Sequence, residues 1–109
     1  MIRGSFLAIL LATAALAEIH VPTSTALAAA EAKPQPDYNR LARQLKVAGD
    51  VSVEVHISPG GEVTEVNVLT GNSLLAGSVV KTVKNWRFKP FLFEGQPTTA
   101  VTILKFTFK

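Results

Sequence analysis

A run of β-branched and aromatic residues from Thr98 to Lys109 constrains the fold more than any other stretch of the sequence. It contains no Gly or Pro, and these residue types favour an extended conformation. Alternate side chains of a strand point to opposite faces, so Leu104, Phe106 and Phe108 should face a core. No later element of the sequence can cover the outer edge of this strand. We therefore expect a long strand whose outer edge can accept a partner.

The N-terminal residues have the pattern of a secretory leader. Arg3 supplies a positive start, and an uncharged apolar run follows from Ser5 to Ala17. Small-x-small cleavage sites close that run and recur near Ala28. A core of about 13 apolar residues is shorter than the roughly 20 that a membrane helix needs. We predict a signal peptide over residues 1–30, cut between Ala28 and Glu31, with a short N-terminal anchor as the alternative; both place the rest of the chain outside the cytoplasm.

A polar stretch separates this leader from the rest of the chain. Residues 31–37 contain Pro34 and Pro36 and are typical of a short exposed linker. Apolar residues at helical spacing then predict a short amphipathic helix from Tyr38 to Ala48, with Asp37 as its N-cap. The folded domain should therefore comprise residues 38–109.

A β-hairpin is expected next. Apolar and polar residues alternate over 51–57, which predicts a half-buried strand. The turn Ser58–Gly61 follows, and Val63 opens the return strand. The apolar positions change parity after Val63, and a bulge near Thr64–Glu65 would reconcile the two registers.

A second helix should follow the hairpin. Leu75, Val79 and Val83 share one helical face, and Gly71–Ser73 can end the hairpin and cap the helix. Gly77 costs a helix about 1 kcal/mol relative to Ala. A close approach of the helix to the sheet at Gly77 would explain that cost.

The element order is therefore helix, strand, strand, helix, strand, with the last strand possibly split around Gly95. The two-layer solution for this order is an α+β fold, in which two short helices pack on one face of a small antiparallel β-sheet. Trp86 and Phe88 return to a period of two and should belong to the core of that fold.

Several short motifs together resemble the C-terminal domain of the TonB family of energy transducers. The resemblance covers Tyr38 to Lys109, and its specific part is Trp-Arg-Phe-x-Pro followed by Gly-x-Pro. The motifs are Gly49-x-Val51-x-Val53-x-Val55-x-Ile57, Gly61-x-Val63, Trp86-Arg87-Phe88-Lys89-Pro90 and Gly95-x-Pro97, with a final alternating Phe-x-Phe.

The resemblance implies a function in transport across the cell envelope. Domains of this family lie in the periplasm and bind an extended segment of a TonB-dependent outer-membrane receptor by adding it as a strand beside their last strand, a mode known as β-augmentation. Full transducers also have a membrane helix with a Ser and a His, and a long proline-rich spacer. Here the apolar run is short and only Lys33–Pro36 corresponds to the spacer. The motifs that full transducers use to couple to an inner-membrane motor are therefore not matched by these residues.

The candidate partner-binding residues lie on the outward positions of the last strand. Arg87 and Lys89, together with Lys81 and Lys84, form a secondary basic patch that could bind lipid head groups or an acidic receptor segment. The simpler interpretation is that these side chains are only solvated. The edge residues are Thr99, Val101, Ile103, Lys105 and Thr107, and the basic patch is centred on Arg87 and Lys89.

Other function classes find little support in the sequence. The formal net charge of +3 is too small to indicate a nucleic-acid binder. There is no cysteine, and His56 has no second ligand nearby in the sequence, so we expect no metal and no cofactor. No nucleophile–base pair or phosphate loop is present, so we do not expect an enzyme.

Two readings without a receptor remain open. The free strand edge could pair with a second copy, which would make the chain a homodimer or a soluble exported scaffold of the envelope. Alternatively, the hairpin Ser58–Gly61 could be presented to an enzyme by a small exported inhibitor.

Overall fold

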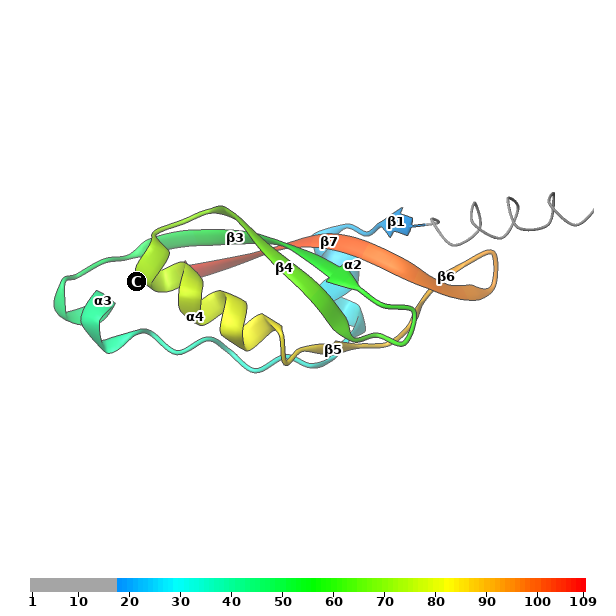
Figure 1. Ribbon diagram of the computed structural model, residues 1–109, viewed down its shortest axis with the longest axis horizontal. Helices are drawn as coiled ribbons and strands as arrows, with labels where there is room; N and C mark the ends of the chain where they lie inside the picture. The colour runs from blue at the N-terminus through cyan, green and yellow to red at the C-terminus, as the bar shows by residue number, and fades with distance from the viewer. Residues whose placement is uncertain (1–17) are drawn as a thin grey trace, which may run out of the picture.

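The computed structural model describes residues 18–109, in which long antiparallel strands form the centre of the molecule (Figure 1). These strands are β3 (Gly49–Ile57), β4 (Val63–Thr70) and β7 (Gln96–Phe108). The short strand β1 (Glu18–His20) completes the order β1-β7-β3-β4. The predicted apolar run of the leader lies outside the described residues.

The pairing of β3 with β7 explains why apolar and polar residues alternate along both strands. The two strands are antiparallel and keep a continuous register from Gly49 opposite Phe108 to Ile57 opposite Ala100. Val53 lies opposite Leu104, and both side chains are buried. The predicted inward face of the last strand is therefore confirmed for Leu104 and Phe108.

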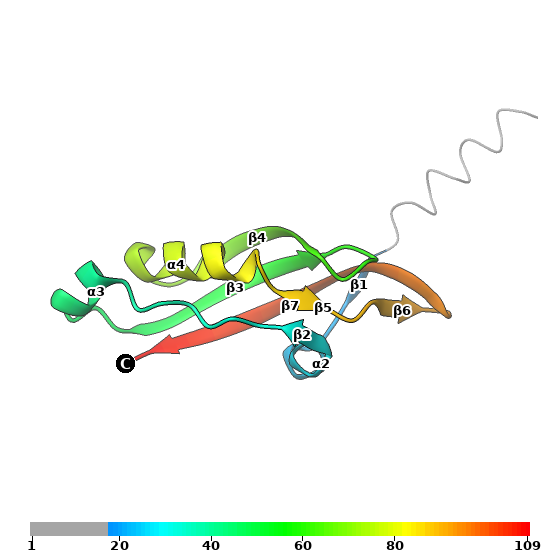
Figure 2. The same ribbon diagram turned by 90° about the horizontal axis from the view of Figure 1, so that it is seen from below.

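The helices α3 (Arg40–Gln44) and α4 (Ser73–Val83) lie on one face of this sheet (Figure 2). Trp86 follows α4 and is buried in the core against Phe106, and its Nε1–H donates to the Pro34 carbonyl at 2.9 Å. The predicted α+β class and the core position of Trp86 are confirmed. The core around the helices is made by Ala42, Val51, Val53, Val55, Ile57, Leu75, Val79, Val83, Trp86 and Phe88.

The first predicted helix is shorter than its apolar pattern indicated. Asn39, not Asp37, is the N-cap, and its side chain accepts hydrogen bonds from the backbone N–H groups of Leu41 and Ala42. Lys46 adopts a positive φ of 58°, which ends the helix before Ala48. The N-cap prediction was wrong because an Asn closer to the apolar residues provides the same hydrogen bonds.

The predicted bulge in the return strand is confirmed. His56 pairs with Glu65 and Ile57 pairs with Val63, so Thr64 is the extra residue. A second register shift at the other end of the hairpin, between the Ser52 and Val53 pairs, was not predicted.

The structure contradicts the explanation given for Gly77. A Cβ atom built on Gly77 would meet nothing within 4 Å, so no close helix–sheet contact requires a glycine there. The residue instead lines a groove between α4 and β4, together with Val68 and Val80.

Residues 18–32 form additional elements around the predicted domain. The helix α2 (Thr23–Ala29) follows β1, and β2 (Ala30–Ala32) pairs with β5 (Arg87–Phe88). β1 runs parallel to β7, so the sheet is mixed and not purely antiparallel as predicted. The predicted split of the last strand is confirmed, since β6 (Phe91–Phe93) turns into β7 through Glu94 and Gly95.

Candidate partner-binding edge

The backbone of β7 alternates between its two neighbours. The Val101 carbonyl accepts a hydrogen bond from the Val21 N–H at 2.8 Å, on the side of β7 away from β3. The Ile103 carbonyl accepts one from the Thr23 hydroxyl at 2.5 Å. Successive residues of a strand direct their backbone groups to alternate sides. Lys105 and Thr107 therefore also direct their N–H and C=O groups toward the outer edge.

The first part of this outer edge is covered. β1 pairs with β7 from Glu18 opposite Thr99 to His20 opposite Val101. Val21 continues the contact, and its carbonyl accepts a hydrogen bond from the buried Thr102 hydroxyl at 2.8 Å. Of the predicted edge residues, Thr99 and Val101 thus already have a neighbouring strand, and Ile103 has a side-chain partner.

The second part of the edge is open among the described residues. No strand pairs with the outer side of Lys105 or Thr107 in residues 18–109. Two hollows border this stretch. One, of about 190 Å³, lies between α2 and Trp86, and the other, of about 280 Å³, is lined by Tyr38 and Phe108. An added strand would find space for its side chains in these hollows.

The open stretch is polar on its solvent face. The Thr107 hydroxyl donates to Asp50 Oδ1 at 2.6 Å, and Lys105 Nζ lies 3.6 Å from Asp50 Oδ2. The hydrogen bond from Thr107, together with the nearby Lys105 charge, lowers the pKa of the exposed Asp50. These contacts are made by side chains, so they do not use the outward backbone N–H and C=O groups of Lys105 and Thr107, which have no pairing strand within residues 18–109.

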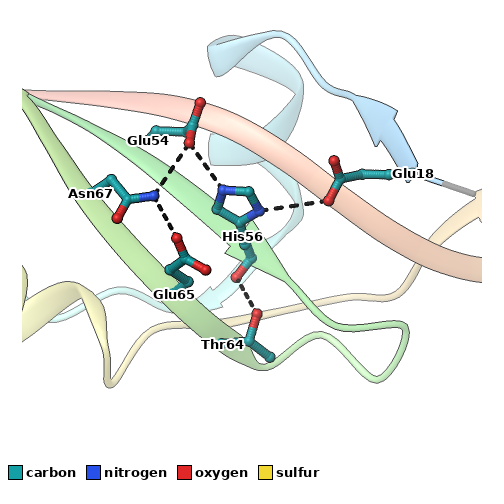
Figure 3. Close-up of polar contacts among 6 residues, drawn as sticks. All are labelled: Glu18, Glu54, His56, Thr64, Glu65 and Asn67. Carbon is teal, nitrogen blue, oxygen red and sulfur yellow. Dashed lines mark hydrogen bonds and ion pairs between the residues drawn. The ribbon is translucent and has the colours of Figure 1, made fainter. Parts of the chain in front are cut away.

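A cluster of polar side chains lies on the same face, beside β1 (Figure 3). His56 Nε2 lies 2.9 Å from Glu54 Oε1, and its Nδ1 lies 3.5 Å from Glu18 Oε2. The hydrogen bond to Glu54 is the main cause that raises the pKa of His56 and lowers the pKa of Glu54. Asn67 donates to Glu65 Oε2 at 2.7 Å and holds that carboxylate next to the cluster. His56 is therefore not isolated, and it connects β3 to β1.

The predicted basic patch is spread over two places. Arg87 is exposed on β5 and donates from Nη1 to the Trp86 carbonyl at 3.0 Å. Lys89 is also exposed, and its backbone N–H donates to the Ala29 carbonyl. Lys81 lies instead on α4 and Lys84 is its C-cap, and both line the groove beside β4. Within residues 18–109, no carboxylate forms an ion pair with any of the four.

Sequence reasoning missed the residues that cover the edge. Glu18, Val21 and Thr23 were assigned to a leader, and the structure places all three against β7. A signal was present, because Glu18, His20 and Pro22 interrupt the apolar run at this point. That interruption marks the end of a leader core as well as the start of a folded segment.

The profile of the family described as "Gram-negative bacterial TonB protein C-terminal" matches residues 34–109. The chain belongs to this TonB C-terminal family. The match covers α3, the β3–β4 hairpin, α4 and the whole of β7, which forms the edge described above, whereas β1 and α2 lie outside it. The family consists of non-enzymatic domains, which confirms the prediction that the chain is not an enzyme.

Similar proteins agree with this assignment. The chain is 31% identical over 68 residues to Protein TonB of Vibrio cholerae serotype O1, covering 61% of this chain and 28% of that protein. It is 30% identical over 86 residues to Protein TonB of Klebsiella pneumoniae, covering 75% of this chain and 34% of that protein. The chain thus spans about a third or less of the length of these relatives.

A solved structure has the same fold. The solution NMR structure of the Pseudomonas aeruginosa TonB CTD superposes with a TM-score of 0.63 at 24% identity, covering 73% of this chain and 83% of that one. In the part of the chain that the structure describes, no helix has the length and apolar character needed to cross a membrane. The same residues contain no cluster of side chains that could hold a metal ion.

Proposed function

We propose that this chain is a periplasmic domain that binds an extended segment of a TonB-dependent outer-membrane receptor, in energy-coupled transport across the envelope. The observation that carries the proposal is the open backbone of β7 at Lys105 and Thr107, on a chain of the TonB C-terminal family. The name TonB borne by the relatives supports the same function.

The bound segment would add to the sheet as a strand beside β7. Backbone hydrogen bonds to Lys105 and Thr107 would supply affinity, and alternate side chains of the segment would enter the hollows beside Trp86 and Tyr38. The predicted edge residues Thr99, Val101 and Ile103 belong to the same site once their present neighbour moves. Arg87 and Lys89 would add favourable charge for an acidic segment near the other end of the domain.

Export by a leader is part of the proposal, and two cleavage positions fit its sequence. A cut between Ala28 and Glu31 would remove β1 and α2 from the fold. A cut after Ala17 follows the same small-x-small rule and would keep both. The mass of the protein purified from the periplasm distinguishes these positions, and a mass that includes residues 1–17 would favour the anchored alternative.

An NMR titration tests receptor binding. Synthetic peptides copied from extended periplasm-facing segments of TonB-dependent outer-membrane receptors are added to the labelled protein. The amide signals of Lys105 and Thr107 should shift most, with smaller shifts at Thr99 and Val101. Shifts confined to α3 and α4 would refute strand addition.

A proline variant separates backbone from side-chain recognition. Lys105→Pro removes an outward N–H that makes no bond to β3, so the sheet should survive while peptide binding is lost. Lys105→Ala is the matched control, because it removes the same side chain and keeps the N–H. Equal binding by the two variants would contradict recognition through the β7 backbone.

The open edge also suits pairing with a second copy of the chain, and this alternative needs its own measurement. Sedimentation at micromolar concentration should show a monomer if the edge serves receptors. A tight dimer that ignores receptor peptides would support the self-associating scaffold instead.

A further inference from the structure

The stretch Glu18–Ala32, called here the N-terminal segment, begins with β1, which occupies the β7 edge as an added strand would. β1 pairs with Thr99–Val101 in parallel register, and the Val21 N–H extends the ladder with a 2.8 Å bond to the Val101 carbonyl. The Thr23 hydroxyl then reaches the Ile103 carbonyl. These carbonyls point to the outer edge, so the segment uses the same backbone groups that a bound peptide would use.

Apolar side chains hold the segment on the domain. Ala26 of α2 is fully buried, and Val21 is also buried in the core cluster. Ile19 is half-buried and packs against that cluster. On the polar face, the Glu18 carboxylate approaches His56 at 3.5 Å. The contacts thus come from both faces of the sheet edge, as expected for a bound strand.

The segment is tied down a second time, away from the edge. The Ala29 carbonyl accepts a hydrogen bond from the Lys89 N–H at 2.8 Å, and β2 pairs with β5 at Phe88 and Arg87. β1 can therefore leave the edge while β2 stays attached. A tether of this length keeps the free strand at a millimolar effective concentration near β7.

We propose that the N-terminal segment is an intramolecular competitor for the β7 edge, so that a partner strand spanning Thr99–Ile103 binds only when β1 is displaced. The inference rests on the proposed function, because it concerns the same edge. It divides the site into an open stretch at Lys105–Phe108, where a partner can start to pair, and a guarded stretch at Thr99–Ile103.

The cost of displacement is moderate. β1 has only 3 residues, and the contact of its Glu18 carboxylate with His56 is partly exposed. The apparent affinity for a partner falls by the fraction of molecules in which the edge is free. For an edge that is free in about one tenth of wild-type molecules, a variant in which β1 is undocked should bind a strand-adding partner about tenfold more tightly.

Two variants undock the segment without changing β7. Ala26→Asp places a charge at a fully buried position of α2, and Val21→Pro removes the N–H that donates to Val101. Thr25→Asp is the matched control, since it adds the same charge at the neighbouring exposed position. Native hydrogen exchange of the β3 and β4 amides shows whether each variant keeps the sheet.

The first readout needs no receptor. We expect amide exchange at Val101, which pairs with His20 of β1, to become faster in both undocking variants and to stay unchanged in Thr25→Asp. A synthetic peptide of residues Glu18–Ser24, added at millimolar concentration to Ala26→Asp, should restore the protection. Unchanged exchange in both variants, or a peptide that protects nothing, would overturn the proposal.

The second readout distinguishes this proposal from the proposed function. Receptor peptides should bind the undocking variants about tenfold more tightly than the wild type or Thr25→Asp. Equal affinity for all four proteins would refute competition and leave receptor binding intact. Failure of every receptor peptide, with protection still restored by the Glu18–Ser24 peptide, would refute receptor binding alone. A periplasmic chain that begins after Ala28 would also overturn the competition.

Discussion

The two edges of the sheet differ in regularity. β7 keeps one register along its whole pairing with β3, from Phe108 to Ala100. β4, at the opposite edge, is interrupted by two register shifts, at Ser52/Val53 and at His56/Ile57. Bulges bend and twist a strand and make its edge a poor template for a further strand. The regular edge is therefore suited to a partner, and the irregular edge is protected from one.

The two sheet edges are also protected from an added strand in different ways. β4 is protected by the two bulges in its own backbone. Because of these bulges, Val68 and Leu69 can be exposed on β4 without inviting a further strand. The β7 edge is protected by a separate segment that can move, and only over Thr99–Ile103. The register shifts of β4 are permanent and keep a further strand from adding there. The segment on the β7 edge can move away, so that edge can bind a partner.

The largest expected effect concerns the turn that begins β4. Gly61 has a φ of +91°, and a Cβ atom there would lie 1.9 Å from the Phe88 carbonyl oxygen. That oxygen belongs to backbone and cannot easily move, so Gly61→Ala should lower the free energy of unfolding by about 3 kcal/mol or more. Urea denaturation measures this loss. Gly60→Ala is the control, since only the Ser58 hydroxyl lies near, at 3.8 Å; an equal loss there would show that the turn has no special position.

A smaller effect is expected where the cover meets β7. Thr102→Val removes the buried hydroxyl that donates to the Val21 carbonyl, and it leaves that carbonyl without its partner. The free energy of unfolding should fall by about 1–2 kcal/mol. Thr107→Val, on the open stretch, should change it by no more than about 0.5 kcal/mol. Equal losses in urea denaturation would mean that the covered and open stretches do not differ.

The elements around these edges were predictable to different degrees. The period of two in β3 and β7 revealed both the strands and their buried face, because burial on one face repeats along the whole strand. The parity change after Val63 revealed the bulge at Thr64. Such patterns are local, and local sequence contains them in full.

The missing parts depend on contacts between residues distant in sequence. Thr23 reaches Ile103 and Val21 reaches Thr102 across most of the chain, and neither pair has a local pattern. A short apolar stretch before such contacts has the same composition as the end of a leader. For the same reason the outward edge residues could be named, whereas their division into covered and open stretches could not.

A substitution in the groove beside β4 should raise the free energy of unfolding, whereas the preceding substitutions lower it. Gly77 lies in α4 with open space where its Cβ would be. Gly77→Ala should therefore raise the free energy of unfolding by about 1 kcal/mol, because Ala is the better helix former. A loss of stability in urea denaturation would show that α4 and β4 approach more closely than the groove allows. Peptide binding at the β7 edge should not change, since that edge lies across the sheet.

The smallest effect concerns the polar cluster that joins the cover to β3. The hydrogen bond to Glu54 raises the pKa of His56, with further contributions from the carboxylates of Glu65 on β4 and Glu18 on β1. The protonated form is thus favoured by folding. Its contribution to stability is complete below the unfolded pKa of about 6.5 and is lost as pH rises through the higher folded pKa.

The same pairing acts in the opposite direction at acid pH. The lowered pKa of Glu54 means that its contribution is lost as pH falls through that pKa, so the cluster is most effective between the two titrations. The urea midpoint of the wild type relative to His56→Gln should therefore decline as pH rises past neutrality. Glu18→Gln should reduce that decline only slightly, because Glu18 is the weakest of the named carboxylates. A difference between wild type and His56→Gln that stays constant with pH would mean that His56 positions β1 through packing, and that charge contributes nothing to the cover on the β7 edge.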